Sequence, residues 1–205
     1  MSGFGSLPSF HRGAAGISPV ELLLALAVAA TVLAVIVPGV HHLRSSVAIR
    51  SAAGQVRAAF YRARMVAIKR GVLVGVKFRR NGGRQEWALY ADGNGNGVRN
   101  AEITSGVDRP LGVFYPWDRN DVLPGILTGA RVPDPGSPGS YLDRPDDPIR
   151  FNNSDICSFS PVGESTPGSV YLWDGHDRMA VVRVFGRSAK IRTLYHRRGE
   201  PGWRK

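Results

Sequence analysis

One carboxylate, Glu21, lies inside the longest apolar run of the chain. The 24 residues 17–40 carry no other charge. At about 1.5 Å per residue, a helix of this length spans roughly 36 Å, enough to cross a bilayer core of about 30 Å. A carboxylate at the bilayer centre costs about 2.5–3.5 kcal/mol, so an acid in such a run is by default a functional residue. The pattern predicts a membrane-spanning helix with a functional acid near one end.

The spacing of Gly16, Glu21 and Pro38 resembles the type IV prepilin signal. In that family a prepilin peptidase cuts after a leader glycine and methylates the new N-terminus. A glutamate at the fifth mature position then pairs with the amine of a neighbouring subunit. The resemblance implies cleavage between Gly16 and Ile17, N-methylation at Ile17, an assembly role for Glu21 and a helix kink at Pro38. The sequence departs from the family at Ile17, where Phe is usual, and at Pro19, which a first helical turn tolerates.

Two other interpretations account for part of this pattern. A plain signal anchor explains the hydrophobicity but not the glycine, the acid and the proline together. A cleaved secretory signal has an apolar core of about 7–15 residues, which is shorter than this run.

Arg12 precedes the apolar run, and the positive-inside rule places that flank in the cytoplasm. Together with the resemblance to the prepilin signal, this orientation predicts a leader over residues 1–16, a transmembrane and assembly helix over residues 17–40, and a periplasmic head over residues 41–205. The protein would be a single-pass protein of the bacterial inner membrane.

The helix is expected to continue to about residue 70, with Gly71 ending it. Apolar residues recur at spacings of three and four, while basic residues mostly lie off that stripe. The expected core-facing residues are Leu43, Val47, Ala52, Val56, Ala59, Phe60, Ala63, Val66 and Ala67.

Alternating strand patterns follow the helix. Residues 72–78 and 85–91 predict a hairpin, and residues 149–160, 169–173, 179–185 and 190–195 predict the closing strands, the last at an edge. Residues 103–148 are rich in proline and predict an irregular loop region with short strands such as 113–115 or 129–132. The expected fold class is α+β, a long helix packed on an antiparallel sheet.

Residues 51–78 resemble the GspH/FimT branch of pseudopilins and minor pilins. The residues that carry the resemblance are Ala63, Arg64, Ala67, Ile68, Lys69, Arg70, Val74 and Val76. It implies a minor pseudopilin of a type II secretion pseudopilus, or alternatively a FimT-like minor type IV pilin in pilus assembly or DNA uptake. The implied partners are a prepilin peptidase, other pseudopilins or pilins contacted through the N-terminal helix, the inner membrane and, for the alternative, DNA.

Asp92, Asn94 and Asn96 match the first half of an EF-hand calcium loop, D-x-[DN]-x-[DN]-G. The motif needs glutamate at its twelfth position, where this chain has Ile103. Asp, Asn and Gly are also ordinary turn residues. A turn is the favoured interpretation, calcium remains the weaker one, and no cofactor is expected.

The formal net charge is +11, which predicts attraction to anionic partners. Eight basic residues lie between Arg183 and Lys205 against one acid, with Tyr195 and Trp203 among them. Such a pattern suits nucleic-acid binding, although a solvated basic tail or a charge-protected edge strand explains it too. The candidate DNA-binding residues are Arg187, Lys190, Arg192, Arg197 and Arg198.

A catalytic function has less support in the sequence than DNA binding has. Asp174, His176 and Asp177 cluster at a predicted hairpin turn, where such residues are common, and no nucleophile motif accompanies them. The sequence therefore predicts a protein that is not an enzyme. The only cysteine, Cys157, allows no internal disulfide.

Overall fold

The structure is a computed structural model. It describes the backbone of residues 18–82, 84–117 and 121–205 and, within these, the side chains outside residues 33–43 and Arg84. The predicted leader, residues 1–16, therefore lies outside the described residues. Internal contacts divide the chain into two compact units, Met1–His42 and Leu43–Lys205.

The first element is the helix α1, Pro19–Arg70, which is continuous over the described part of the range predicted for one helix, residues 17–70. Gly71 follows it with φ +68°, and its amide donates to the Ala67 carbonyl at 2.9 Å. This left-handed residue is the predicted helix end, and it stops the hydrogen-bond ladder where the basic residues Lys69 and Arg70 meet the negative end of the helix dipole.

The predicted membrane span, residues 17–40, falls partly on residues outside the described side chains. Within the part of the chain that the structure describes, no helix combines the length and apolarity that crossing a bilayer requires. The side chains of residues 18–32 are all exposed.

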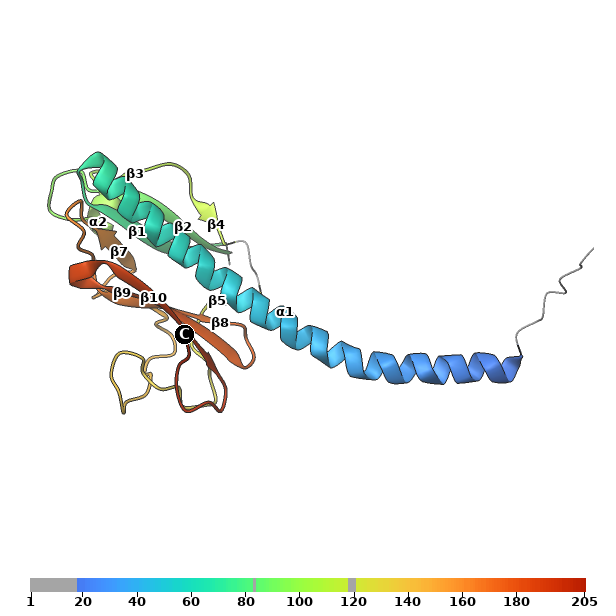
Figure 1. The fold of residues 1–205 in the computed structure, drawn as a ribbon. Coiled ribbons are helices and arrows are strands. Elements are labelled where there is room, and N and C mark those ends of the chain that lie inside the picture. The colour runs from blue at the N-terminus through green and yellow to red at the C-terminus, as the bar shows by residue number, and fades with distance from the viewer. Residues whose placement is uncertain (1–17, 83, 118–120) are drawn as a thin grey trace, which may run out of the picture. The chain divides into compact units, whose positions relative to one another are not determined.

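Two antiparallel sheets, not one, form the strand layers of the head, residues 43–205 (Figure 1). Sheet A has the strand order β3-β2-β1-β7, with β4 also paired to β2, and sheet B has the order β10-β9-β8-β5, with β6 also paired to β8. Sheet A consists of β1 (Val74–Asn81), β2 (Arg84–Ala91), β3 (Arg109–Pro110), β4 (Tyr115–Pro116) and β7 (Ile156–Phe159). Sheet B consists of β5 (Leu123–Pro124), β6 (Ile149–Arg150), β8 (Gly168–Trp173), β9 (Arg178–Phe185) and β10 (Lys190–Arg197).

The prediction of one strand over residues 149–160 is wrong. The chain turns between β6 and β7, where Asn152 has φ 53° and the Ser154 amide donates to the Phe151 carbonyl at 3.0 Å. Because of this turn, β6 pairs with β8 in sheet B whereas β7 pairs with β1 in sheet A. One segment thereby contributes to both sheets, which is why a single-sheet head was also an incorrect expectation.

The loop region contains more structure than predicted. A short helix, α2 (Asn100–Ser105), precedes β3, and the left-handed Gly106 ends it. Residues 129–132 do not form the expected strand, although Pro133 bridges to Tyr141 just beyond them. The β1–β2 hairpin is also tighter than predicted, because Asn81 pairs with Arg84 and leaves only two residues between the strands.

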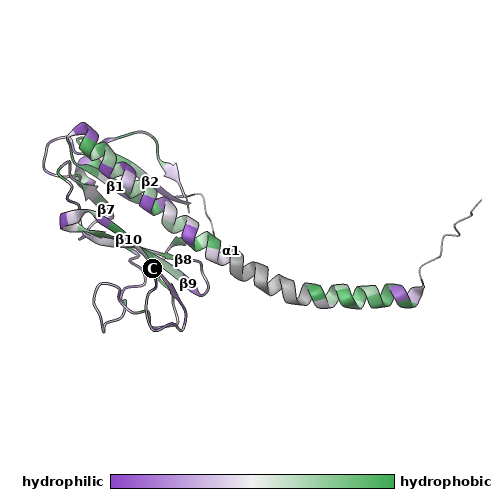
Figure 2. Cartoon of the chain, viewed as in Figure 1, coloured by the Kyte–Doolittle hydropathy of each residue, from purple (hydrophilic) through white to green (hydrophobic). Residues whose placement is uncertain are grey.

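One face of α1 packs against both sheets and forms the main core of the head. Phe60 lies at its centre, fully buried, with its ring centroid 6.1 Å from Phe78 and 5.9 Å from both Phe151 and Phe159. Small residues along this face, such as Ala52 and Ala63, let the strands approach the helix closely. Figure 2 shows hydrophilic and hydrophobic residues alternating along this part of α1.

The predicted core face is confirmed for most of its described members but not for Val47. That side chain is 62% exposed, because it lies on the side of the helix opposite the buried Ala48, Ala52 and Ala59. The error has a physical cause: a second apolar stripe runs along the outer face of the same helix.

Candidate functional site

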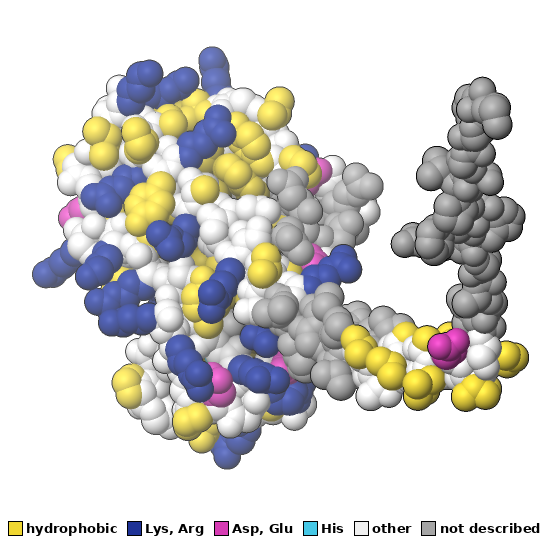
Figure 3. All heavy atoms as spheres, turned by 45° about the vertical axis from the view of Figure 1, so that its right-hand side comes forward, with side chains coloured by type: hydrophobic (Ala, Val, Ile, Leu, Met, Phe, Trp, Pro, Cys, Tyr) yellow, Lys and Arg dark blue, Asp and Glu magenta, His cyan; other side chains and the backbone are white. Residues whose placement is uncertain are grey.

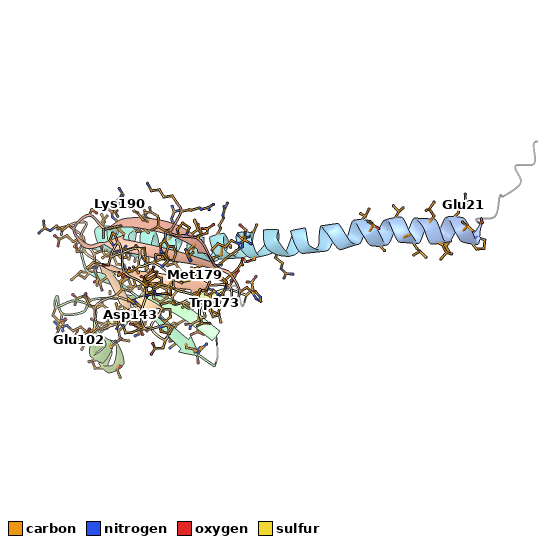
Figure 4. The ribbon with its side chains drawn as sticks, turned by 90° about the horizontal axis from the view of Figure 1, so that it is seen from below. Glu21, Glu102, Asp143, Trp173, Met179 and Lys190 are labelled. Atoms are coloured by element: carbon orange, nitrogen blue, oxygen red, sulfur yellow. The ribbon has the colours of Figure 1, made fainter. Side chains whose placement is uncertain are left out.

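The N-terminus of α1 places Glu21 in a capping box. Ser18 precedes the helix, and its side-chain oxygen accepts from the Val20 amide at 3.4 Å. Glu21 Oε2 in turn accepts from the Ser18 amide at 3.2 Å. The sequence S-x-x-E satisfies two amides that the helix itself leaves without partners. Glu21 thus has a local role in the free chain (Figure 4).

The other residues of the predicted processing site are not described. Gly16 and Ile17 lie outside the described residues, and Pro38 lies within α1 at a position whose side chain is outside them. Cleavage, methylation and the helix kink stay predictions.

The described apolar side chains of the first unit have no cover within that unit. Seven large aliphatic residues there are between 50% and 73% exposed and follow one another around the helix. They are Val20, Leu22, Leu23, Leu24, Leu26, Val28 and Val32. An apolar surface of this extent marks a protein or membrane contact.

The Asp92 loop closes on its own backbone. Asp92 Oδ1 accepts from the amides of Asn94 and Gly95 at 3.0 and 2.8 Å, and Oδ2 accepts from the Gly97 amide at 2.8 Å. Burial raises the pKa of Asp92, but these backbone hydrogen bonds outweigh burial and lower the pKa below its ordinary value. The carboxylate is therefore an organiser of the turn, as expected for an Asx-type loop.

The amide side chains of this loop point to α2. Asn94 Nδ2 and Asn96 Nδ2 donate to Glu102 Oε1 at 3.1 and 2.7 Å, and Asn94 Oδ1 accepts from the Asn96 amide. These side-chain hydrogen bonds lower the pKa of Glu102 (Figure 4). In the ranges that the structure describes, no group of three or more His, Cys, Asp or Glu side chains could hold a metal ion.

The five candidate DNA-binding residues do not form one group. Arg187, Lys190 and Arg192 are exposed at the start of β10 and in the turn before it. Arg197, at the far end of β10, forms an ion pair with Asp177 at 2.8 Å, and Arg198 donates to the carbonyls of Thr128 and His176. At about 3.3 Å per residue, roughly 23 Å of strand separates Lys190 from Arg197.

The first group gains a residue across the hairpin. Arg183 on β9 lies opposite Arg192 on β10, and both guanidinium groups lie over the ring of Phe185, at 5.6 and 5.4 Å from its centroid. We call Arg183, Arg187, Lys190 and Arg192 the basic corner. Among the described residues, no ion pair joins the basic corner to a carboxylate. Figure 4 places Lys190 at the edge of the head. The face of the molecule drawn in Figure 3 carries many Lys and Arg side chains and few acids.

Sequence reasoning did not place Arg183 at this site. Both strands of this hairpin, β9 and β10, were predicted from the sequence. The pairing of Arg183 with Arg192 depends on the strand register, which is known only once the turn between the strands is known. The aromatic residues expected to interleave with the basic ones are engaged elsewhere. Tyr195 packs against the main core, and Trp203 packs against a second cluster while donating to the Pro133 carbonyl at 2.7 Å. Phe185, 37% exposed, is the aromatic side chain of the basic corner.

The polar cluster at the β8–β9 turn is a structural one. Asp174, 8% exposed, accepts from the amides of His176 and Arg178 at 2.9 and 3.1 Å, and from the Ser45 hydroxyl. Its oxygens are therefore occupied in holding the turn and in joining it to α1, as the turn interpretation of this cluster expects.

Comparison with known proteins adds one positive finding. The family described as type II transport protein GspH matches residues 52–186, which include residues 52–70 of α1 and all strands except β10. No curated protein and no solved structure matches the chain. The match confirms the resemblance seen in residues 51–78, and it supports a structural role in type II transport rather than an enzymatic one. Because the match covers well over half of the 205 residues, the chain belongs to the GspH family of type II transport proteins.

Proposed function

We propose that the chain is a minor pseudopilin, a structural subunit of the type II secretion pseudopilus that takes part in protein export across the outer membrane. The observation that carries this proposal is the GspH match over residues 52–186, which spans most of the head helix and every strand except β10. The prepilin-like N-terminus of the sequence supports it independently.

In this proposal a prepilin peptidase removes residues 1–16 and methylates Ile17. Before assembly, residues 17–40 hold the subunit in the bacterial inner membrane with its head in the periplasm. The exposed aliphatic side chains of residues 20–32 support such an environment, because water would leave a large apolar surface uncovered. In the filament, neighbouring subunits would cover the same side chains.

Glu21 would carry assembly. A methylated Ile17 amine and the Glu21 carboxylate are each costly in an apolar bundle, and pairing across subunits neutralises both. Glu21 uses Oε2 in the capping box, and a carboxylate oxygen has further acceptor capacity for a second partner.

Substitution of Glu21 tests this role. We expect Glu21→Ala to insert into membranes at the wild-type level but to enter pseudopili poorly, as measured by immunoblots of sheared filaments and of membranes. Glu21→Gln, which keeps the shape but loses the charge, should share the defect. Glu164→Ala, an exposed acid of the head, is the matched control and should assemble normally. Normal assembly of both Glu21 variants would show that Glu21 is not needed for filament assembly.

A second function, DNA binding by a FimT-like minor pilin, is supported by the basic corner. Two of its four cations, Arg183 and Arg192, lie over the exposed Phe185 ring, and among the described residues no ion pair joins any of the four to a carboxylate. This composition suits phosphate contacts and base stacking. Residues 187–205 lie outside the GspH match, so this function does not follow from the family match.

Salt-dependent binding of the full chain in detergent to duplex DNA tests this alternative. We expect Arg183→Ala/Arg192→Ala to weaken binding and to reduce the slope of log K against log salt by about 0.9 per lost phosphate contact. Arg109→Ala/Arg131→Ala removes the same charge from exposed positions elsewhere and should change binding less. An equal loss in both double variants would indicate nonspecific attraction to a basic protein.

A further inference from the structure

The outer face of α1 in the head carries a continuous line of exposed apolar and small side chains. We call it the outer seam, and it consists of Val47, Ser51, Gly54, Ala58, Tyr61, Met65 and Ile68. All seven residues are exposed, and the four large ones are 62%, 44%, 71% and 55% exposed in chain order. The opposite face of the same helix is the one buried in the core.

The spacing of the outer seam alternates strictly between four and three residues. From Val47 to Ile68 the chain advances 21 residues, or three heptads. A repeat of 3.5 residues on one face is the pattern that aligns one helix along another in a coiled coil. A helix needs no such repeat on a face that only water contacts.

Gly54 gives a second indication of close contact. Glycine in a helix interior costs about 1 kcal/mol relative to alanine. A Cβ at this position would meet nothing within 4 Å, so no contact inside the head explains the glycine. With Ser51 and Ala58 on either side, it forms a shallow centre of the outer seam where another backbone can approach.

The residues that flank the outer seam determine which helix can bind. Arg50, Arg57 and Arg64 follow one side at intervals of seven, and Arg62 and Lys69 follow the other. No Asp or Glu occurs between residues 22 and 85. In coiled coils these flanking positions face those of the partner and set its identity.

This charge pattern excludes a second copy of the same helix. In a parallel pair, one basic flank would face the other basic flank, and in an antiparallel pair each flank would face itself. The antiparallel arrangement places Arg50, Arg57 and Arg64 opposite one another, and the parallel one places Arg57 opposite Arg62 and Arg64 opposite Lys69, which destabilises helix pairs. The partner must therefore carry carboxylates along the edges of its own apolar seam.

Three of the flanking guanidinium groups lie over aromatic rings, and Arg57 is one of them, over Tyr61 of the outer seam at 6.0 Å from the ring centroid. Arg50 lies over Tyr195 at 5.8 Å and Arg62 over Tyr115 at 4.8 Å from the ring centroids. Such contacts position a cation without neutralising it. Within the described residues, no ion pair involves a basic residue of either flank.

We propose that the outer seam binds an acidic amphipathic helix of a non-identical subunit of the filament. This inference rests on the proposed function for the identity of the partner as a filament subunit, but its chemistry rests on α1 alone. It gives the head its own partner specificity, separate from the apolar contacts of residues 17–40. It also predicts that the chain joins a filament next to a different subunit rather than next to itself.

Two synthetic helices of three heptads test the charge rule with the full chain in detergent. Both have the same Ala/Leu seam, and their flanking positions carry Glu in one and Lys in the other. By fluorescence anisotropy, we expect the Glu helix to bind with an affinity that falls as salt rises, and the Lys helix to bind at least tenfold more weakly. Arg57→Glu/Arg64→Glu should weaken binding of the Glu helix about tenfold, and Met65→Ala should weaken it severalfold.

The matched control is Arg109→Glu/Arg131→Glu, which makes the same charge change at exposed positions outside both the outer seam and the basic corner. It should bind the Glu helix like the wild-type chain. Equal binding of the two helices, or equal losses in both double variants, would overturn the inference. Efficient disulfide dimers of purified Ala58→Cys would also overturn it, because they would show a second copy on the seam. Each result leaves the proposed function intact, since that depends on peptidase processing and on secretion.

Discussion

The Ser45 hydroxyl on α1 donates a 2.5 Å hydrogen bond to Asp174 Oδ2 in the turn between β8 and β9, 129 residues further along the chain. Asp174 Oδ1 meanwhile accepts from two amides of its own turn. One carboxylate therefore closes the hairpin of sheet B and joins it to the helix. The contact fixes the end of the hairpin against the first turns of the head part of α1.

Loss of the hydrogen bond between Ser45 and Asp174 should lower the stability of the head. Ser45→Ala leaves a nearly buried carboxylate with one fewer donor, and hydrogen bonds to charged groups contribute about 1.5–3 kcal/mol. We expect the free energy of unfolding to fall by that order, measured by urea titration of the full chain in detergent with tryptophan fluorescence. Ser46→Ala, the neighbouring substitution, should change it by less than about 0.5 kcal/mol. Equal effects of the two substitutions would show that the Asp174 contact contributes nothing specific.

Phe60 should be the most sensitive position of α1. Its side chain is fully buried among three other phenylalanine rings, so Phe60→Ala leaves a cavity and should cost about 3–5 kcal/mol in the same titration. Met65→Ala, on the exposed face of the same helix, should cost little. If Phe60→Ala were as mild as Met65→Ala, the core face assigned to α1 would be incorrect.

The Asp92 loop should give the head an acid-sensitive stability. The pKa of Asp92 is lower in the folded chain, because backbone hydrogen bonds outweigh burial. Its contribution is therefore fully present above the ordinary carboxyl pKa of about 3.9 and is lost as the pH falls through the lower, folded pKa. We expect Asp92→Asn to lower the unfolding midpoint at pH 7 and to flatten its dependence below about pH 4. An unchanged slope in that range would assign the acid sensitivity to other groups.

Calcium should leave the stability of the head unchanged. Both oxygens of Asp92 accept backbone amides, and Asn94 and Asn96 direct their amide nitrogens to Glu102. Thermal unfolding of the full chain with calcium and then with a chelator in excess checks this directly. A midpoint that rises with calcium and returns with the chelator would show that the loop rearranges around a cation.

The sequence predicted those parts of the fold that depend on local pattern. The four- and three-residue spacing of Ala52, Val56 and Ala59 marks a core face, and Gly71 ends the helix because glycine adopts the left-handed conformation without strain. The β8–β9 hairpin was predicted from its two strand patterns and from the turn residues 174–177 between them. Each of these features is decided by neighbours along the chain.

The errors concern features that tertiary contacts decide. Val47 is apolar and in helical register with neighbours of the core face, yet it belongs to the outer seam, because two apolar stripes share one helix. The turn at Asn152 lies in the run Asn-Asn-Ser-Asp, which is a turn signal that the prediction of one strand did not use. The pairing of its two flanking segments with different sheets is decided by tertiary contacts. The candidate basic residues separated into two groups because strand length and the Asp177 ion pair decide their positions.

The intact mass of the protein from membranes of cells with and without a prepilin peptidase tests the central claim most directly. A minor pseudopilin should lack residues 1–16 and carry one added methyl group only when the peptidase is present. Full-length protein in both strains, or a cut at another position, would contradict the pseudopilin assignment, and the assembly role of Glu21 would fall with it.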